Sequence, residues 1–302
     1  MVYRIKRYGR LKQPNDTRDL TTLSDLPQEL ESLKKGLSVF YDTTLELPAT
    51  VDLRKYNSSV KDQGAVGACV GFATAAMDEF FKKKKYGQIR NGSGIYIYKV
   101  GRVKEGWEGD TGLYCRSGVG ALRTHGIVPE EFYERNMHLW DPSDGSWDKE
   151  PDAMAIGWAQ NYQLIKYLRL DPDGPAGDQI VQSLKKSIAN SYGFLFGFNC
   201  YDSLTHEETN NTGNVPFPVA GEDLIGGHAV FACGYDDGVE IASPYSESSK
   251  TTGAFLFKNS WGPNWGESGY GRIPYEYFKQ KLADDCYTIT RAEYLDERDF
   301  TY

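Results

Sequence analysis

Residues 61–81, KDQGAVGACVGFATAAMDEFF, place a cysteine at the point where a glycine-rich stretch becomes an apolar one. Gly64 and Gly67 favour a tight turn before the cysteine. Alanine, methionine, phenylalanine and glutamate then recur at helical spacing, which predicts a helix whose first turn contains Cys69. At that end of a helix the free N–H groups and the dipole stabilise a thiolate. The stretch therefore predicts either a reactive thiol with a lowered pKa or a small buried core residue.

The overall composition restricts the class of protein. With 302 residues, 40% of them hydrophobic, the chain is long enough for one large domain or two fused half-domains. Its net charge of −8 argues against a nucleic-acid-binding protein, which would present a basic face. The basic run at residues 82–85 suits the C-terminal end of the helix that starts at Cys69.

The number and spacing of the cysteines indicate whether disulfides or a metal site are expected, and the first residues indicate whether a secretion signal is present. Five cysteines without a CxxC pair argue against a disulfide framework and against a structural zinc site. The first twenty residues lack the apolar core of a secretion signal, and no apolar run reaches the roughly 18 residues of a membrane span. We therefore expect no metal, no organic cofactor and no membrane partner. The compartment stays undetermined, with the cytoplasm or leaderless export favoured over signal-peptide secretion.

Helical and strand-like patterns occupy different parts of the chain. Helical spacing dominates from Cys69 to about Leu122, and residues 178–193 predict one more amphipathic helix. Residues 138–178 are rich in Asp, Pro, Gly and Trp and are interpreted as long connections. Aromatic and β-branched runs separated by Gly, Pro and Asn follow after residue 193. Helices first and strands later predict an α+β fold with two differently built halves.

His228 differs from the other three histidines in its surroundings. The sequence IGGHAVFACGYDD at residues 225–237 places it near the start of an apolar strand, directly after two glycines. Those glycines allow another chain or a substrate backbone to approach the imidazole closely. A hydrogen-bonded core histidine is the alternative.

A third motif lies at residues 257–274, FKNSWGPNWGESGYGRIP. Asn259 ends an apolar strand there, and two tryptophans and four glycines follow it. The Asn259 side-chain carbonyl can accept an imidazole N–H, and Trp261 can keep water away from that bond. A purely structural turn would not require tryptophans on both sides of a Gly-Pro pair.

Together these motifs supply the groups of a nucleophilic enzyme. Cys69, His228 and Asn259 have the residue types of a nucleophile, its base and the group that orients the base. Gln63 can add an amide N–H to a developing oxyanion, beside the backbone N–H of Cys69. Each motif is weak alone, and the combination is specific.

The motifs, in this order, resemble those of the papain-like cysteine peptidases. The resemblance rests on LPATVDLRKYNSSVKDQGAVGACVGFA at residues 47–73, GGHAVFACGY at 226–235 and NSWGPNWGESGYGRI at 259–273. The bacterial branch of the family is resembled especially, through SGIYIYKVGR at 93–102 and DTGLYCRSGVGALRTHGIVPE at 110–130.

This resemblance implies a two-lobed fold in residues 47–302. A helical lobe would lie mainly in residues 60–135 and a β-barrel-like lobe mainly in residues 190–295, with the active-site cleft between them. The implied activity is that of an endopeptidase that hydrolyses peptide bonds of peptides or proteins through an acyl-enzyme on Cys69, with His228 as acid and base. A peptide ligase or amidase on the same triad, or a catalytically silent homologue that serves as a binding module, are the alternatives.

The resemblance also implies substrate-binding positions. Gly112 and Leu113 would hold the substrate backbone, while Tyr114 and Gly227 would line the pocket for the second residue before the cut, with Trp261 beside them. Because Gly227 carries no charge, we expect an apolar substrate side chain in that pocket.

Residues 1–46 have no evident place in either lobe. They end at LELPAT, where mature chains of the resembled family typically begin. We therefore expect either a short pro-segment of a zymogen, lying in or across the cleft and inhibiting the enzyme, or a structural strap on the back of the β lobe.

Overall fold

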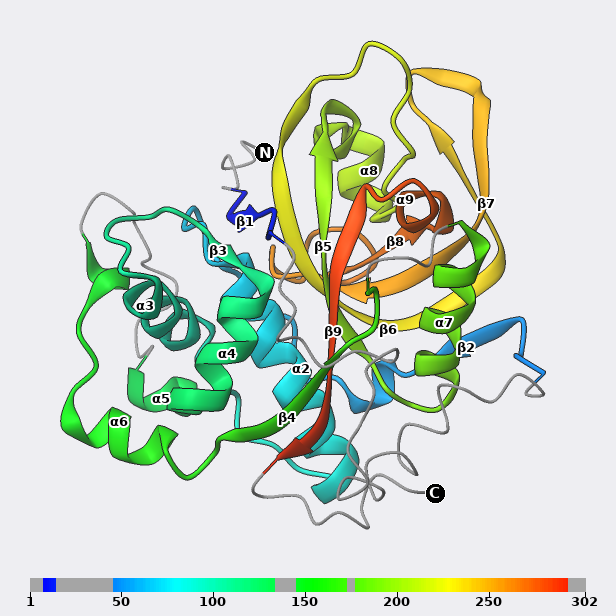
Figure 1. Ribbon diagram of the computed structural model, residues 1–302. Helices are drawn as coiled ribbons and strands as arrows, with labels where there is room; N and C mark the ends of the chain where they lie inside the picture. Colours follow the sequence, from blue (N-terminus) through cyan, green and yellow to red (C-terminus); the bar gives the residue numbers. More distant parts are fainter. Residues whose placement is uncertain (1–7, 15–45, 134–144, 173–176, 293–302) are drawn as a thin grey trace.

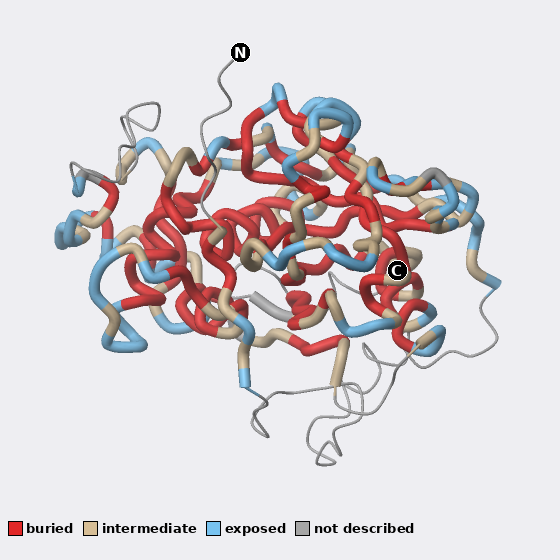
Figure 2. Tube along the Cα trace, turned by 90° about the horizontal axis from the view of Figure 1, so that it is seen from above, coloured by how far each residue is buried: buried red, intermediate tan, exposed pale blue. Residues whose placement is uncertain are grey.

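The computed structural model describes residues 8–14, 46–133, 145–172 and 177–292. Within these ranges the chain forms two lobes: helices gather in one, and a seven-stranded sheet with short helices around it forms the other (Figure 1). The α+β fold with two differently built lobes predicted from the sequence is confirmed. Figure 2 shows that buried segments run through the middle of the molecule, whereas exposed segments lie at its periphery.

The helical lobe is built around α2 (Cys69–Tyr86), which is buried along its first thirteen residues. The helix ends at Gly87, whose φ of 71° closes the C-terminus, and lysines fill its last turn. The predicted start at Cys69 and the predicted basic end are therefore confirmed. The other helices of this lobe are α3 (Gly94–Glu105), α4 (Cys115–His125), α5 (Glu130–Tyr133) and α6 (Ala153–Ala159).

The sheet of the second lobe has the strand order β4-β9-β5-β6-β7-β8, and β2 pairs with β6 beside this path. β4 and β8 lie at the two ends of the path, so the described strands form an open, curved sheet rather than a closed barrel (Figure 1). Its strands are β2 (Thr50–Asp52), β4 (Leu164–Arg169), β5 (Phe194–Tyr201), β6 (Leu224–Ser243), β7 (Ser246–Lys258), β8 (Tyr270–Pro274) and β9 (Ala283–Ala292).

Shorter helices surround the sheet and the connections. They are α7 (Asp178–Ala189), α8 (Glu207–Thr212), α9 (Tyr275–Lys279) and the 3-10 helices η2 (Arg54–Tyr56), η4 (Ser146–Asp148) and η5 (Asp202–Thr205). The helix predicted at residues 178–193 is thus present as α7. The sequence also allows a short helix around Leu26 to Leu37, which lies outside the described residues.

The interpretation of residues 138–178 as connections is wrong in part. This region contains η4, α6 and β4, and β4 pairs antiparallel with β9. Leu164 and Leu168 of β4 are buried, so this strand contributes to the core. The sequence pattern does not reveal β4 for two reasons. Its pairing partner β9 lies more than a hundred residues away, and the polar residues that flank β4 obscure its short apolar pattern.

The two lobes share one core. Phe80 of α2 packs against Phe231 of β6, with their ring centroids 5.2 Å apart. A buried charged group lies in the same region: the Lys61 ammonium is 2.6 Å from the fully buried carboxylate of Glu79 on α2, and the ammonium of Lys258 at the end of β7 is 3.9 Å from it. We call Lys61, Glu79 and Lys258 the lobe-joining cluster. It fixes α2 against the strand that precedes Asn259.

The first described residues cross the boundary between the lobes. β1 (Arg10–Leu11) pairs in parallel with β3 (Leu113–Tyr114), which leads into α4 (Figure 1). We call residues 8–14 the cleft strap.

Candidate active site

Cys69 is the first residue of α2, and the loop before it is held from several sides. The backbone N–H of Gly67 donates to the Asp110 carboxylate at 3.0 Å, and the same carboxylate accepts the Tyr98 hydroxyl at 2.6 Å. The Tyr98 hydroxyl in turn accepts the backbone N–H of Gly112 at 2.9 Å. These contacts tie the cysteine loop to the strand predicted to bind the substrate backbone.

The thiol of Cys69 is fully buried. Burial is the largest influence on this thiol and raises the pKa of Cys69 to about 11, although backbone hydrogen bonds act in the opposite direction. These bonds come from Ala229, Gly9 and Val70. The lowered pKa predicted from the helix dipole is therefore wrong for this state of the chain, because loss of water around the thiol outweighs the dipole.

His228 lies on β6 and is held on three sides. Its Nε2 is 2.8 Å from Oδ1 of Asn259, and both side chains are buried. The Trp261 ring stacks on the imidazole, with a centroid distance of 4.4 Å and an interplanar angle of 28°. The edge of Phe198 meets the imidazole at 5.7 Å. The structure thus brings together the imidazole, the amide carbonyl and the apolar cover that the sequence motifs predicted.

The cysteine and histidine motifs meet at the residue after the histidine. The backbone of Ala229 forms the hydrogen bond to the Cys69 thiol described above, so the start of α2 and this part of β6 are in contact. Because Oδ1 of Asn259 occupies Nε2, that nitrogen carries the proton of a neutral imidazole, and Nδ1 is the position for exchange with a thiol.

Gln63 connects the cysteine loop to the asparagine motif. Its backbone N–H donates to the Ser260 carbonyl at 2.8 Å, and its side-chain carbonyl accepts the Ser260 hydroxyl at 2.6 Å. The side-chain amide donates to the Val66 carbonyl at 2.9 Å. Gln63 is therefore placed beside the predicted triad, and its role toward an oxyanion stays a prediction.

The cleft strap occupies the positions expected to hold a substrate. The backbone N–H of Leu113 donates to the Gly9 carbonyl at 2.7 Å. Gly112 has a φ of 81° and lies so close to Gly9 that a side-chain carbon on Gly112 would collide with the Gly9 carbonyl.

Three further predicted substrate-binding residues also meet the strap. Gly227 lies against the Arg10 main chain, and Tyr114 is the register partner of Leu11. The Trp261 ring lies edge-on to Tyr8, with 6.1 Å between the ring centroids. The predicted substrate-binding residues thus contact one continuous segment of the chain itself.

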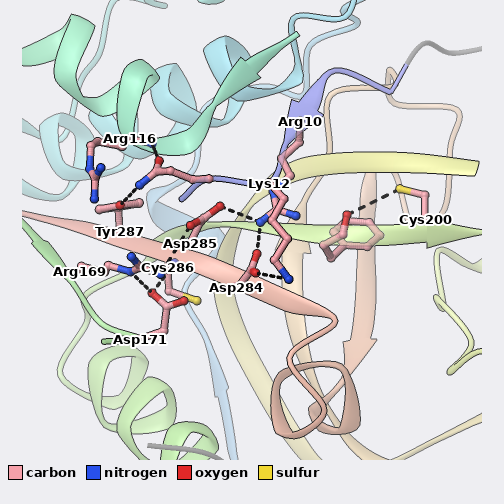
Figure 3. Close-up of polar contacts among 12 residues, drawn as sticks. Arg10, Lys12, Arg116, Arg169, Asp171, Cys200, Asp284, Asp285, Cys286 and Tyr287 are labelled. Atoms are coloured by element: carbon pink, nitrogen blue, oxygen red, sulfur yellow. Dashed lines mark hydrogen bonds and ion pairs between the residues drawn. The ribbon is translucent and has the colours of Figure 1, made fainter. Parts of the chain in front are cut away.

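Sequence reasoning missed several residues that shape this site. Asp110 and Tyr98 hold the cysteine loop, and Phe198 supports the imidazole, but none of them stands in a pattern that points to a site. Asp284 and Asp285 contact Arg10 of the strap (Figure 3). Their signal is visible in the sequence as two adjacent acids within the buried strand LADDCYTI.

The chemistry of the other thiols and the hydropathy of the helices add two findings. All five cysteines are buried free thiols. In the described parts of the chain, no helix has both the length and the apolar character needed to cross a membrane.

Comparison with known proteins places the chain among its relatives. Residues 181–290 match the family described as Papain family cysteine protease. An uncharacterized peptidase C1-like protein of Acanthamoeba polyphaga mimivirus is 29% identical over 294 residues, which cover 94% of this chain and 86% of the viral protein. The thiol protease aleurain of Arabidopsis thaliana is 25% identical over 288 residues, which cover 88% of this chain and 68% of aleurain. The crystal structure of xylellain, a cysteine protease from Xylella fastidiosa, is similar at a TM-score of 0.71 and 30% identity, with 93% of this chain and 95% of xylellain covered.

Proposed function

This chain belongs to the papain family of cysteine peptidases, which are hydrolases, and we propose that it is an endopeptidase with Cys69 as nucleophile, His228 as acid and base, and Asn259 as the orienting group. The observation that supports this assignment best is the buried contact between His228 and Asn259 under the Trp261 ring. It fixes the ring beside the start of α2, where the thiol lies.

In the proposed reaction, the sulfur of Cys69 attacks the carbonyl carbon of the scissile bond while the thiol proton passes to Nδ1 of His228. The C–N bond then breaks, the imidazolium returns the proton to the leaving amine, and the acyl group remains on sulfur as a thioester. Water then attacks the thioester and gives a proton to the imidazole. That step releases the carboxylic acid and the free thiol.

The oxyanion of the tetrahedral intermediate would be held by the backbone N–H of Cys69 and the side-chain amide of Gln63. Replacing Gln63 by alanine is therefore expected to lower kcat by about 10²–10³, as removal of such a donor does in other enzymes. Steady-state kinetics on a peptide substrate measure this effect.

Ser260→Ala is the matched control for Gln63→Ala. It removes the hydroxyl that donates to the Gln63 carbonyl but leaves the Gln63 amide in place, so kcat is expected to change much less. Equal losses in the two variants, or an unchanged kcat in Gln63→Ala, would remove Gln63 from the mechanism.

We further propose that the cleft strap inhibits the enzyme, as a pro-segment of a zymogen does. The strap covers the thiol, and its Gly9 carbonyl takes the hydrogen bond from Leu113 that a substrate backbone would need. A backbone hydrogen bond from Gly9 reaches the sulfur, so the strap contacts the proposed nucleophile directly.

Alkylation of Cys69 by iodoacetamide tests both proposals. In the full chain we expect slow labelling at pH 7 and a rate that rises about tenfold per pH unit toward the raised pKa of Cys69, about 11. A chain that begins at Leu47 keeps β2 but lacks the strap. It should label roughly 100-fold faster or more at pH 7 and should cleave a peptide library, because the thiol regains water and an ordinary thiol pKa is about 8.5.

Peptide mapping by mass spectrometry reads out this experiment, and the four other buried cysteines are the internal control. They should stay unlabelled in both chains while the fold is intact. If the shorter chain folds but labels no faster than the full chain, the strap is structural and not inhibitory. If it labels fast yet cleaves no peptide, the peptidase proposal fails, whereas the proposal that the strap covers the Cys69 thiol is supported.

A further inference from the structure

Arg10 sends its side chain from the cleft strap into the sheet lobe, where it is buried. Its Nη2 contacts Oδ1 of Asp284 and lies 2.7 Å from Oδ2 of Asp285 (Figure 3). The side chain of Asp285 is 2% exposed and that of Asp284 is 21% exposed. A cationic side chain thus fills a deep acidic pocket next to the proposed catalytic cysteine.

The backbone of β9 is bent so that both carboxylates reach one guanidinium. Neighbouring residues in a regular strand point to opposite faces of the sheet. Asp285 instead has a φ of 57°, in the left-handed region that residues with side chains rarely adopt. The pairing of β9 with β5 also shifts register between Leu195 and Gly197. The irregularity turns two adjacent acids toward the same group.

The walls of this pocket leave room for a long side chain. Gly197 of β5 lies so close to Arg10 that a side-chain carbon there would collide with the guanidinium. The Cys115 thiol at the start of α4 lies close enough to Arg10 to hydrogen-bond its side chain. Gly197 on one side and the Cys115 thiol on the other therefore form the walls around the Arg10 guanidinium, above the two carboxylates.

The charges of the pocket depend on the strap. Asp284 is paired with Arg10 and, at 3.6 Å, with Lys12, and both cations belong to the strap. Asp285 also has Arg169 at 3.6 Å, on the strand β4 of the lobe itself. When the strap leaves, Asp284 loses both of these cations. An uncompensated carboxylate at this depth strongly favours the entry of another cation.

We propose that Asp284 and Asp285 form the floor of a substrate pocket that selects an arginine or lysine side chain, with arginine preferred. This inference rests on the proposed peptidase function. Arg10 lies beside Gly227 and pairs in register with Leu113, so the pocket is the one assigned to the second residue before the cut. The apolar preference expected from Gly227 is therefore replaced, because the carboxylates at the floor decide the charge of the ligand.

Arginine fits better than lysine because its guanidinium offers several donors in one plane to two carboxylates. Leucine fills part of the same space but leaves both carboxylates without a donor. Citrulline has the length and shape of arginine without the charge. It therefore separates the effect of charge from that of size.

The test uses the full chain with Arg10→Ala, which empties the pocket of its own occupant. Fluorogenic peptides carry arginine, lysine, citrulline or leucine at the second position before the cleaved bond. We expect kcat/KM for arginine to exceed that for citrulline by about 10- to 100-fold, as for a hydrogen bond to a charged group. Adding Asp284→Asn should reduce this ratio to within about threefold.

Two further variants control this result. Asp284→Glu keeps the charge and should retain part of the preference for arginine. Glu240→Gln removes an exposed acid of β6, 64% exposed, and should leave the ratio unchanged. If Arg10→Ala does not fold, Arg10→Gln takes its place. A preference for leucine, or an arginine-to-citrulline ratio that survives Asp284→Asn, overturns the proposal and leaves the acids as an anchor for the strap alone.

A binding measurement keeps this result separate from the failure of the proposed function. If neither these variants nor the chain that begins at Leu47 cleaves any peptide, the peptidase proposal fails. Calorimetry with acetyl-arginine amide and acetyl-citrulline amide on the Arg10→Ala chain still tests the pocket. Binding of the arginine compound alone, lost with Asp284→Asn, supports it, whereas equal binding or no binding of the two compounds contradicts it.

Discussion

Loss of peptide hydrolysis, by a factor of roughly 10⁴ or more in kcat, is the expected result of replacing Cys69 by alanine or His228 by glutamine. Without the thiol no acyl-enzyme forms, and without the imidazole neither the thiol nor the leaving amine exchanges its proton. Asn259→Ala should cost less, because Asn259 orients the ring and carries no proton in the reaction. Steady-state and single-turnover kinetics on the chain that begins at Leu47 measure the three effects.

The choice of glutamine at position 228 follows from the surroundings of the imidazole. His228 is fully buried between Trp261 and Phe198, so alanine there would leave a cavity as well as remove the base. Thermal melting of each variant is the control. Equal losses of activity in all three variants, each accompanied by a lower melting temperature, would indicate that Cys69, His228 and Asn259 form a structural cluster and not a catalytic triad.

A loss of about 3–5 kcal/mol in the free energy of unfolding is the expected result of Glu79→Gln. The carboxylate of Glu79 lies fully buried between Lys61 and Lys258, and it also accepts the Ser58 hydroxyl. Its neutral replacement leaves the buried Lys258 ammonium without a carboxylate partner among the described residues, whereas Lys61 keeps the Glu130 carboxylate, 3.4 Å away. Both ammonium groups are too deep to be rehydrated without opening the boundary between the lobes. Urea denaturation at pH 7 measures the change.

Glu131→Gln is the matched control for Glu79→Gln, because it removes an acid of the same lobe from an exposed ion pair. Glu131 and Arg90 are each 61% exposed and 3.4 Å apart, so the expected loss is about 0–1 kcal/mol. If the free energy of unfolding falls by similar amounts in the two variants, the lobe-joining cluster stabilises the fold no more than an exposed ion pair does.

The pH dependence of the cluster has a definite sign. Burial alone raises the pKa of Glu79, but the ammonium groups of Lys61 and Lys258 outweigh burial and hold it below its ordinary value. The folded state therefore binds fewer protons than the unfolded chain as pH falls. The stabilisation from Glu79 is complete above the ordinary carboxyl pKa of about 4.3 and is lost as pH drops toward the lower folded-state value.

How much of this site follows from the sequence depends on the range of the contacts. The helix start at Cys69 and the end of β7 before Asn259 follow from local spacing and turn chemistry, and the structure bears them out. The contact between His228 and Asn259 follows from the complementary chemistry of their two motifs, since an imidazole N–H and an amide carbonyl form a hydrogen bond. That prediction needs no estimate of the distance between the motifs in the fold.

The contacts that sequence reasoning missed are those that depend on the path of the chain. Arg10 meets Asp285 across a separation of 275 residues, and neither residue type nor periodicity announces such a pair. The raised pKa of the Cys69 thiol is missed for the same reason. The helix dipole is a local property, whereas the burial that opposes it comes from a distant segment that covers the thiol.

The parallel pairing of β1 with β3 places the strap in the cleft of its own chain, so the occupancy of the cleft by the strap does not depend on the protein concentration. The strap and the cleft belong to one polypeptide, so under the proposed inhibition a substrate competes with a tethered segment whose effective concentration would be on the order of millimolar. Diluting the protein leaves that competition unchanged. One cut between residue 14 and β2 turns the strap into a separate peptide at the concentration of the protein itself, commonly far below millimolar. On the proposed inhibition, a single broken bond would thus convert a permanent competitor into a dissociable one.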